Sequence, residues 1–216
     1  QFNVDIFGVA DSSGEVEIIT LVDKAFKFFG AKSGDYTIKL NDRKFVNYLL
    51  NDYIELDEAS AHSVGKLIDR MNKMDRSDFI TKLDEILTPE QKKSGSTEKL
   101  LAVLEAKSLN ELSADLRSNE VLSDLTEILA DLKSAGINNV VFDPTVMRGF
   151  DYYTGIVFEV NDNHPDNNRS MLGGGRYDGL VGLFGVAPVP TVGFGWGDVT
   201  LQNFLELHNL LPDLVS

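Results

Sequence analysis

Short strand-like segments that follow one another without intervening helices constrain the fold most. In the last third of the 216-residue chain, four segments have strand character: Asn139–Asp143, Tyr152–Val160, Met171–Tyr177 and Thr191–Gly197. Turns and short polar segments connect them. Parallel neighbours need a crossover connection of about a dozen residues or more, usually a helix. The pattern therefore predicts an antiparallel sheet and argues against a doubly wound parallel one.

The N-terminal part of the chain adds a strand and a helix to this pattern. Gln1–Val9 alternates between an apolar face and a face that carries an amide and a carboxylate, which predicts a strand. Ser12 and Glu15 have the spacing of a capping box at the start of a helix. Apolar residues at helical spacing follow, and Gly30 is expected to end that helix.

A long helical region separates the first strands from the last ones. Tyr36–Leu40 is expected to be a strand, after which Asn41 or Asp42 caps the next helix. From about residue 45 to residue 133 the apolar residues recur at helical spacing. Pro89 is expected to close one of these helices, and Gln91–Thr97 is predicted to be a polar loop.

These elements predict an α+β fold with two parts. Residues 1–49 and 121–216 are expected to form an antiparallel sheet with flanking helices, and residues 50–120 an α-helical insertion. A final helix should begin at Asp198, whose side chain is placed to cap it. The length of 216 residues is sufficient for one core with a small inserted domain.

Composition excludes several classes of protein and site. The chain has no cysteine, so disulfides and cysteine-ligated metals are ruled out, and its three histidines do not have metal-ligand spacing. The formal net charge of −14 argues against a surface that coats nucleic acid, although a local basic patch is compatible with it. No apolar run approaches the about 20 residues of a membrane span. The absence of cysteine permits a reducing compartment, and a cytoplasmic location is expected.

Two stretches combine polar side chains with bare backbone at predicted strand ends. Met147–Val160 places an arginine, an aspartate and two adjacent tyrosines before an apolar strand. Leu172–Leu180 contains three consecutive glycines followed by an arginine, a tyrosine and an aspartate. Glycines let a ligand approach the main chain, and arginines supply fixed positive charge. Together the two stretches predict a small-molecule site.

The same stretches resemble the histidyl-tRNA synthetase family, a branch of the class II aminoacyl-tRNA synthetases. Arg148–Glu159 (RGFDYYTGIVFE) and Gly173–Leu180 (GGGRYDGL) are similar to the two histidine-specific stretches of the family. Gln1–Phe7 resembles the strand that closes the second class II motif, and Val192–Leu201 resembles the third motif. The resemblance brackets almost the whole chain and implies the fold of the class II catalytic core.

The resemblance implies a two-step reaction. Histidine and ATP give histidyl-adenylate and pyrophosphate, and the histidyl group then moves to the 3′ end of tRNA(His). Magnesium is implied by ATP chemistry, not by a ligand set in the sequence, and no metal-binding residue is predicted. The full-length enzyme is expected to be a homodimer, and the helical insertion is expected to approach the tRNA acceptor stem.

The resemblance also implies a histidine pocket. Asp5 and Tyr153 are expected to read the two imidazole nitrogens, since a buried polar site rejects side chains that leave it unpaired. Gln1 is expected near the α-amino group, with Tyr152 lining the pocket and Tyr177 closing it. The floor is expected to be kept open by the glycines Gly173, Gly174 and Gly175.

For ATP, the resemblance gives Arg148 the central place. It is expected to contact both histidine and the α-phosphate and to bridge two groups that repel each other. Gly195 and Gly197 are expected to let the adenine end lie against backbone. The third class II motif normally ends with an arginine that stacks on ATP, but Thr200 stands there in this chain. The source of the missing positive charge is not indicated by the sequence.

Some questions stay open at this level. Arg176 and Asp178 fit either a mutual ion pair or ligand contact. A histidine-sensing regulatory subunit of ATP phosphoribosyltransferase, a non-catalytic paralogue, is an alternative to a ligase; an unrelated acidic binding module is a third. The chain starts at Gln1 and lacks a match to the first motif. We therefore expect a piece of a longer protein, inert in catalysis by itself.

Overall fold

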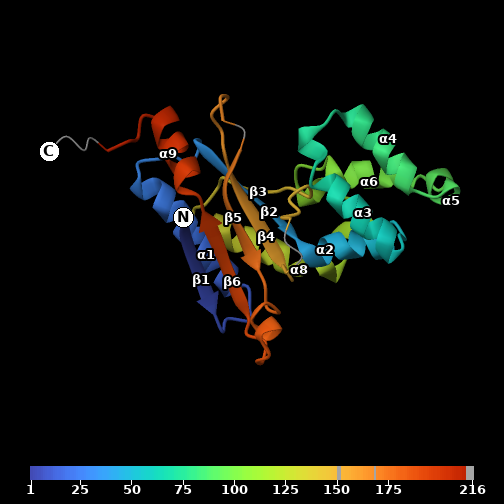
Figure 1. Cartoon of the computed structure of the whole chain (residues 1–216), viewed down its shortest axis with the longest axis horizontal. Coiled ribbons are helices and arrows are strands. Elements are labelled where there is room, and N and C mark those ends of the chain that lie inside the picture. The colour runs from blue at the N-terminus through green and yellow to red at the C-terminus, as the bar shows by residue number, and fades with distance from the viewer. Residues whose placement is uncertain (150–151, 168, 213–216) are drawn as a thin grey trace.

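The computed structural model describes residues 1–149, 152–167 and 169–212. Within them, strands far apart in sequence join one sheet in the order β1-β6-β5-β4-β2-β3 (Figure 1). The strands are β1 (Phe2–Phe7), β2 (Tyr36–Asp42), β3 (Val140–Phe142), β4 (Ile156–Asp162), β5 (Ser170–Arg176) and β6 (Thr191–Trp196). All neighbours are antiparallel except the β2–β3 pair, which is parallel. The predicted fold class is confirmed, and the short parallel pair adds to it.

Three helices cover one face of this sheet. α1 (Ser13–Phe28) contacts β1 and β6, α8 (Ser123–Ser134) contacts β2 and β3, and α9 (Asp198–Leu207) contacts β5. Phe26 of α1 is fully buried in the resulting core, stacked on Tyr36 at 4.4 Å and edge-on to Phe204 at 5.2 Å. The apolar alternation of the strands faces these helices, which leaves the opposite face of the sheet for polar groups.

Helices fill the region between β2 and β3, as the periodicity predicts, and gather to one side of the sheet (Figure 1). The main ones are α2 (Arg43–Tyr48), α3 (Glu58–Ile68), α4 (Arg76–Ile86), α5 (Pro89–Lys93), α6 (Ser96–Leu104) and α7 (Ala114–Arg117). Short π- or 3-10-helical turns lie at η1 (Leu49–Tyr53), η2 (Met71–Lys73), η3 (Leu109–Glu111) and η4 (Glu120–Leu122). That residues 50–120 form a separate domain stays a prediction.

The predicted capping box of the first helix is wrong. Ser12 precedes α1 but its side chain makes no capping hydrogen bond. Asp11 takes that role, accepting a hydrogen bond from the Ser13 amide at 3.0 Å. Glu15 does not turn back to the helix start, because its carboxylate pairs with the guanidinium of Arg176 on β5.

The other two predicted caps have different outcomes. Asp42 caps α2, accepting a hydrogen bond from the Lys44 amide at 2.8 Å, which confirms one of the two residues predicted for that helix. Asp198 is already inside α9, and the capping residue is Gly197, which has no side chain to offer. Asp198 therefore acts at most through its charge in the first turn.

Three element boundaries also differ from the prediction. Tyr152 and Tyr153 precede β4, which begins at Ile156. Pro89 does not close a helix but opens α5, where the Thr88 hydroxyl and the Gln91 side chain form a capping box. The predicted polar loop Gln91–Thr97 consequently holds the end of α5 and the start of α6. None of the described helices is long and apolar enough to cross a membrane.

Candidate active site

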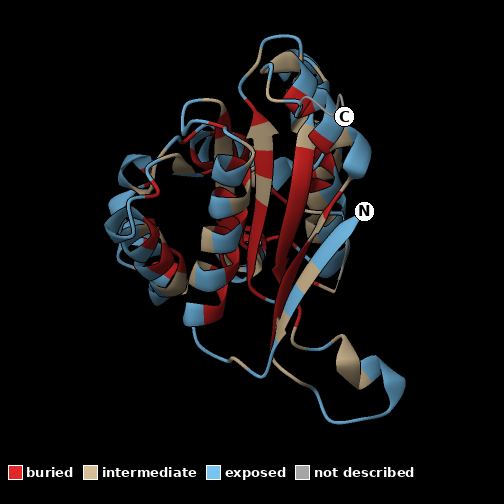
Figure 2. Cartoon of the chain, turned by 90° about the vertical axis from the view of Figure 1, so that its left-hand side faces the viewer, coloured by how far each residue is buried: buried red, intermediate tan, exposed pale blue. Residues whose placement is uncertain are grey.

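The open face of the sheet carries a cavity of about 530 Å³. β1 supplies one wall with side chains that alternate toward it, and β5 and β6 supply the floor. Figure 2 shows β1 as the exposed strand beside the N-terminus, at the edge of a largely buried sheet. The cavity is lined by Gln1, Asn3, Asp5, Phe7, Arg148, Tyr152, Tyr153, Gly173, Tyr177, Leu180, Val181, Phe184, Gly193, Phe194 and Gly195.

Glycines leave the floor of this cavity bare. A Cβ atom on Gly173 would lie 2.5 Å from Cζ of Arg148 and 2.9 Å from the Phe158 carbonyl oxygen. A Cβ atom on Gly193 would lie 2.7 Å from the Tyr177 hydroxyl. Real Cβ contacts do not come so close, so any other residue would displace the site's side chains. The two glycines are therefore required for these side chains to lie over the sheet.

The other glycines of the prediction lie in different places. Gly195 lines the cavity, beside Gln1 and Asn3. A Cβ on Gly175 would meet the Tyr153 ring at 2.9 Å, so Gly175 supports that tyrosine. Gly174 faces the helix-covered side, where a Cβ would lie 2.7 Å from Cβ of Phe194. Gly174 can therefore reach the cavity through its main chain alone.

Three tyrosines form an aromatic wall. The rings of Tyr152 and Tyr153 lie 4.6 Å apart, and Tyr177 meets them at 5.6 Å and 6.1 Å in edge-to-face contacts. Burial raises the pKa of Tyr153 to about 12, helped by the neighbouring Tyr152 hydroxyl. Burial and the hydrogen bond to Asp5 hold the pKa of Tyr177 well above its usual range. Both hydroxyls are thus neutral hydrogen-bond donors at physiological pH.

The polar side of the cavity comes from β1. Asp5 accepts a hydrogen bond from the Tyr177 hydroxyl across the sheet. Gln1 donates from Nε2 to Oδ1 of Asn3 at 3.0 Å. Because alternate residues of a strand share a face, the amides and the carboxylate point to the same side. The structure thereby brings Gln1 and Asp5 together with all three tyrosines.

Arg148 has the one cationic side chain among the described residues that line this cavity. Its backbone has a φ of +49°, unusual for a residue other than glycine. A terminal nitrogen, Nη1, donates to Oε1 of Glu159 at 3.0 Å. The preceding loop is held by the buried Asn41, whose amide donates to the carbonyl oxygens of Pro144 at 3.1 Å and Val146 at 3.0 Å. Phe150 and Asp151 of the same predicted stretch lie outside the described residues.

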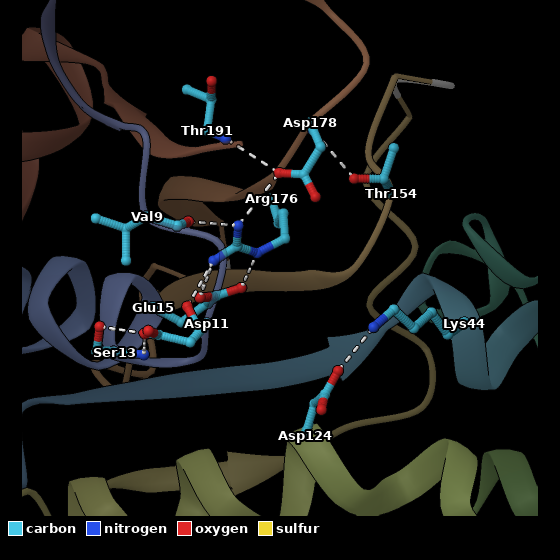
Figure 3. A network of polar contacts seen from close by, with 10 residues as sticks. All are labelled: Val9, Asp11, Ser13, Glu15, Lys44, Asp124, Thr154, Arg176, Asp178 and Thr191. Carbon is cyan, nitrogen blue, oxygen red and sulfur yellow. Dashed lines mark hydrogen bonds and ion pairs between the residues drawn. The ribbon is translucent and has the colours of Figure 1, made fainter. Parts of the chain in front are cut away.

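Arg176 is a structural centre beside the cavity (Figure 3). Its side chain is 8% exposed and makes a two-pronged ion pair with Glu15, at 2.5 Å from both Nε and Nη2. Nη2 also donates to the Asp11 carbonyl oxygen at 3.0 Å, and Nη1 to the Val9 carbonyl oxygen at 2.9 Å. With the bond from Nη1 to Asp178 at 3.2 Å, all five N–H donors of the guanidinium are used.

These contacts favour the structural interpretation of Arg176 and Asp178. Asp178 Oδ1 accepts from Arg176 and from the Thr191 amide at 3.0 Å (Figure 3). The Asp178 amide donates to the Thr154 hydroxyl at 3.1 Å. The pair therefore ties β5 to the start of β6 and to the segment before β4. Tyr177, which lies between Arg176 and Asp178, is fixed by this network.

Not all of the residues predicted to bind ATP line the cavity. Gly197 does not line the cavity, and its neighbour Thr200 donates to the carbonyl oxygens of Met171 at 2.7 Å and Gly197 at 2.8 Å. Thr200 therefore fastens α9 to β5 and supplies no charge. Within the described part of the chain, no group of three or more His, Cys, Asp or Glu side chains is arranged to hold a metal ion.

Sequence reasoning missed several residues of the site. Asn3 and Phe7 line the cavity together with Gln1 and Asp5, and the strand alternation was the signal that could have assigned them. Glu159 was detectable as a carboxylate inside an apolar strand pattern. Asn41 gave no local signal, because its partners lie more than a hundred residues away.

Two further hollows lie outside this cavity. One of about 390 Å³ is lined by α2, α3 and Arg148, and it contains the basic side chains of Arg43, Lys66 and Arg70. Another of about 560 Å³ lies between α8 and β3. None of the predicted site residues lines the second one. Arg148 lines both the 390 Å³ hollow and the cavity on the open face of the sheet, so it lies where that cavity meets the helical region.

The sheet, its helices and the glycine-floored cavity define a class II aminoacyl-tRNA synthetase core. Residues 1–197 match the sequence profile of the family described as "Histidyl-tRNA synthetase". The chain is 38% identical to the histidine–tRNA ligase of Leptospira biflexa over 217 residues, which cover all of this chain and 49% of that protein. The chain belongs to the histidyl-tRNA synthetase family.

More distant relatives agree. The chloroplastic/mitochondrial histidine–tRNA ligase of Arabidopsis thaliana is 34% identical over 99% of this chain and 43% of that protein. A crystal structure of histidyl-tRNA synthetase from Nostoc sp. PCC 7120 has the same fold, with a TM-score of 0.80 at 23% identity over 97% of this chain and 50% of that one. The chain spans about half the length of the curated relatives it matches.

Proposed function

We propose that this chain carries the amino-acid-activating site of a histidine–tRNA ligase. In the first step, a carboxylate oxygen of histidine attacks the α-phosphorus of ATP. A new oxygen–phosphorus bond forms, the bond from the α-phosphorus to the bridging oxygen breaks, and pyrophosphate leaves. In the second step, a hydroxyl at the 3′ end of tRNA(His) attacks the histidyl carbonyl carbon. A carbon–oxygen ester bond forms, the bond from that carbon to the phosphate oxygen breaks, AMP leaves, and the hydroxyl proton is released.

The observation that carries the proposal is the position of Arg148. Its guanidinium lies over Gly173 in the same cavity as Asp5, Tyr153 and Tyr177. The attacking carboxylate and the triphosphate are both anionic, so a fixed cation between them lowers their repulsion. The carboxylate is already the nucleophile, so the first step requires no general base. Orientation and charge neutralisation carry the step.

Recognition of histidine follows from the donors and acceptors of the pocket. Tyr177 already uses one oxygen of Asp5, which leaves the carboxylate with further acceptor capacity for an imidazole N–H. The neutral hydroxyl of Tyr153 is suited to donate to the other ring nitrogen. A side chain without two such nitrogens could not make both of these hydrogen bonds, which supports discrimination in favour of histidine.

Replacement of Arg148 by alanine tests the proposal. We expect Arg148→Ala, in the longest chain that the gene encodes, to reduce histidyl-adenylate formation about 100- to 1,000-fold. Histidine binding, measured by calorimetry, should change far less, because Asp5 and the tyrosines remain. Glu127→Gln, at an exposed site on α8, is the matched surface control. If histidine affinity fell as far as the rate, Arg148 would be a binding residue and not the group that neutralises charge.

Several properties of the whole protein stay predictions. ATP is expected as substrate, with Mg²⁺ bound largely through its phosphates, as small divalent sites commonly are. Gly195 is suited to the nucleotide by its place in the cavity, whereas Gly197 is not part of that lining. A homodimer, contact of the helical region with tRNA(His), and a cytoplasmic location are also expected.

A second candidate has one observation in its favour. A structure from Bacillus halodurans, described as an ATP phosphoribosyltransferase regulatory subunit/histidyl-tRNA synthetase, has a TM-score of 0.76 at 25% identity over 95% of this chain and 52% of that one. A regulatory subunit has no need of an arginine at Thr200. It also has no α-phosphate to neutralise, so Arg148 in the cavity favours the ligase.

A further inference from the structure

We propose that Glu159 is a positioning residue that sets the Arg148 guanidinium over the glycine floor. This inference rests on the proposed ligase function and concerns the same site. The contact that motivates it is the hydrogen-bonded ion pair from Nη1 of Arg148 to Oε1 of Glu159, at 3.0 Å. Glu159 itself does not line the cavity, so it can act on the reaction only through Arg148.

The register of the sheet explains why Glu159 is suited to this task. Glu159 on β4 lies opposite Gly173 on β5, which lies opposite Gly195 on β6 and then Asn3 on β1. These residues form one row across the open face. In this row the two glycines leave a trough two strands wide, about 10 Å. Glu159 lies at one edge of the trough, on β4. The side chain of Arg148 extends from that edge over Gly173 toward the cavity.

Arg148 needs a partner that orients its side chain, because its own backbone conformation does little to fix that orientation. It lies in a loop, outside any strand or helix, and its backbone has an unfavourable positive φ of 49°. Its Nε is buried without a hydrogen-bond partner among the described atoms. Glu159 accepts a hydrogen bond from one terminal nitrogen, and Arg148 also has a side-chain hydrogen bond with Tyr153. Arg148 lines the cavity, so its positive charge lies where an anionic ligand would bind. The pair thus orients the cation without consuming it.

The lysine opposite Glu159 on the adjacent strand pairs with a different carboxylate, so it does not compete with Arg148 for Glu159. Lys39 on β2 lies opposite Glu159 in the register, but its ammonium group pairs with Asp143 at 3.1 Å. The side chains of Arg148 and Glu159 are 19% and 26% exposed, so solvent screens their attraction in part. The contact is therefore expected to matter more for the position of the Arg148 guanidinium than for the stability of the fold.

A double-mutant cycle tests the proposal, with full-length wild type, Glu159→Gln, Arg148→Ala and the combined variant. Glutamine keeps the shape and an acceptor oxygen but loses the charge. We expect Glu159→Gln to lower the turnover number of histidine-dependent ATP–pyrophosphate exchange about tenfold, and Glu159→Asp about 100-fold, because a shorter side chain draws Arg148 back toward β4. Histidine affinity should stay within about twofold in both variants. Glu17→Gln, at an exposed position on α1, is the control.

The decisive comparison is the effect of Glu159→Gln with and without Arg148. If Glu159 acts through Arg148, the substitution has no further effect in the Arg148→Ala background. Equal fold losses in the two backgrounds would overturn the proposal, as would full activity of Glu159→Asp. Should the combined variant fail to fold, the single variants decide: a fall in turnover at constant histidine affinity supports the role, and parallel loss of both refutes it. A wild type without histidine-dependent exchange would instead remove the proposed function.

Discussion

At the scale of single residues, Asp42 shows how a structural cap can oppose stability. Its carboxylate is fully buried, and Oδ2 has no hydrogen-bond partner among the described atoms. Burial raises the pKa of Asp42 to about 6, because the charged form loses its hydration. The folded state therefore binds a proton more tightly than the unfolded state. The stabilising contribution is present below pH 4 and is lost as the pH rises to about 6.

Asp42→Asn should remove this pH dependence. Asparagine caps helices as well as aspartate does, and it stays neutral. We expect the free energy of unfolding of the variant, relative to wild type, to increase by up to about 3 kcal/mol between pH 4 and pH 7.5. Urea unfolding of both proteins at several pH values measures this difference, in which the other carboxylates cancel. A difference that is constant with pH would mean that the pKa of Asp42 is the same in the folded and unfolded states, which would contradict the effect of burial.

Residues whose role depends on local pattern could be predicted from the sequence. Alternation along a strand placed Gln1 and Asp5 on one face, and the structure keeps them there. The partner of Arg176 could not be predicted, because Glu15 lies 161 positions away and gave a plausible local explanation as a helix cap. A two-pronged bond to a buried guanidinium outweighs one exposed capping bond.

At the scale of elements, the Arg176–Glu15 pair joins α1 to the strand that carries Tyr177. Both side chains are almost completely buried, at 8% and 3% exposure, and the hydrogen bonds to Glu15 raise the pKa of Arg176 further above its usual range. Removal of one partner from such a pair leaves an uncompensated buried charge. The network is thus a condition for placing the helix, the sheet end and the aromatic wall together.

Arg176→Lys should break this junction although it keeps the charge. An ammonium group has three donors and cannot reproduce the fork that holds Glu15 and two carbonyl oxygens. We expect a loss of about 3 kcal/mol in the free energy of unfolding, measured with denaturant. Lys99→Arg, at an exposed position on α6, is the control for the substitution type. A loss below about 0.5 kcal/mol would show that the pair is replaceable.

Element types were predicted better than element ends. Strand propensity extended the predicted β4 back to Tyr152, yet the strand begins at Ile156. The reason is tertiary: the rings of Tyr152 and Tyr153 pack against Tyr177 instead of continuing the strand. The packing of an aromatic side chain against its neighbours can therefore outweigh its preference for a strand.

At the scale of the whole molecule, one face of the sheet is closed by helices and the other is left for chemistry. The short connections between the last strands predicted the antiparallel sheet. The parallel β2–β3 pair was not predictable, since about a hundred residues of helical chain separate its strands. The helices pack on one face of the sheet, and the cavity lies on the other. Glycines are tolerated in the middle of this sheet because the hydrophobic core does not depend on side chains at their positions.

The central claim is that this open face activates histidine with ATP. The most direct measurement is amino-acid-dependent ATP–pyrophosphate exchange, with the longest chain that the gene encodes and each of the 20 amino acids in turn. The account predicts exchange with histidine at least about a thousandfold above any other amino acid. Absence of exchange, with histidine still bound in calorimetry, would contradict the claim and assign the fold to histidine sensing.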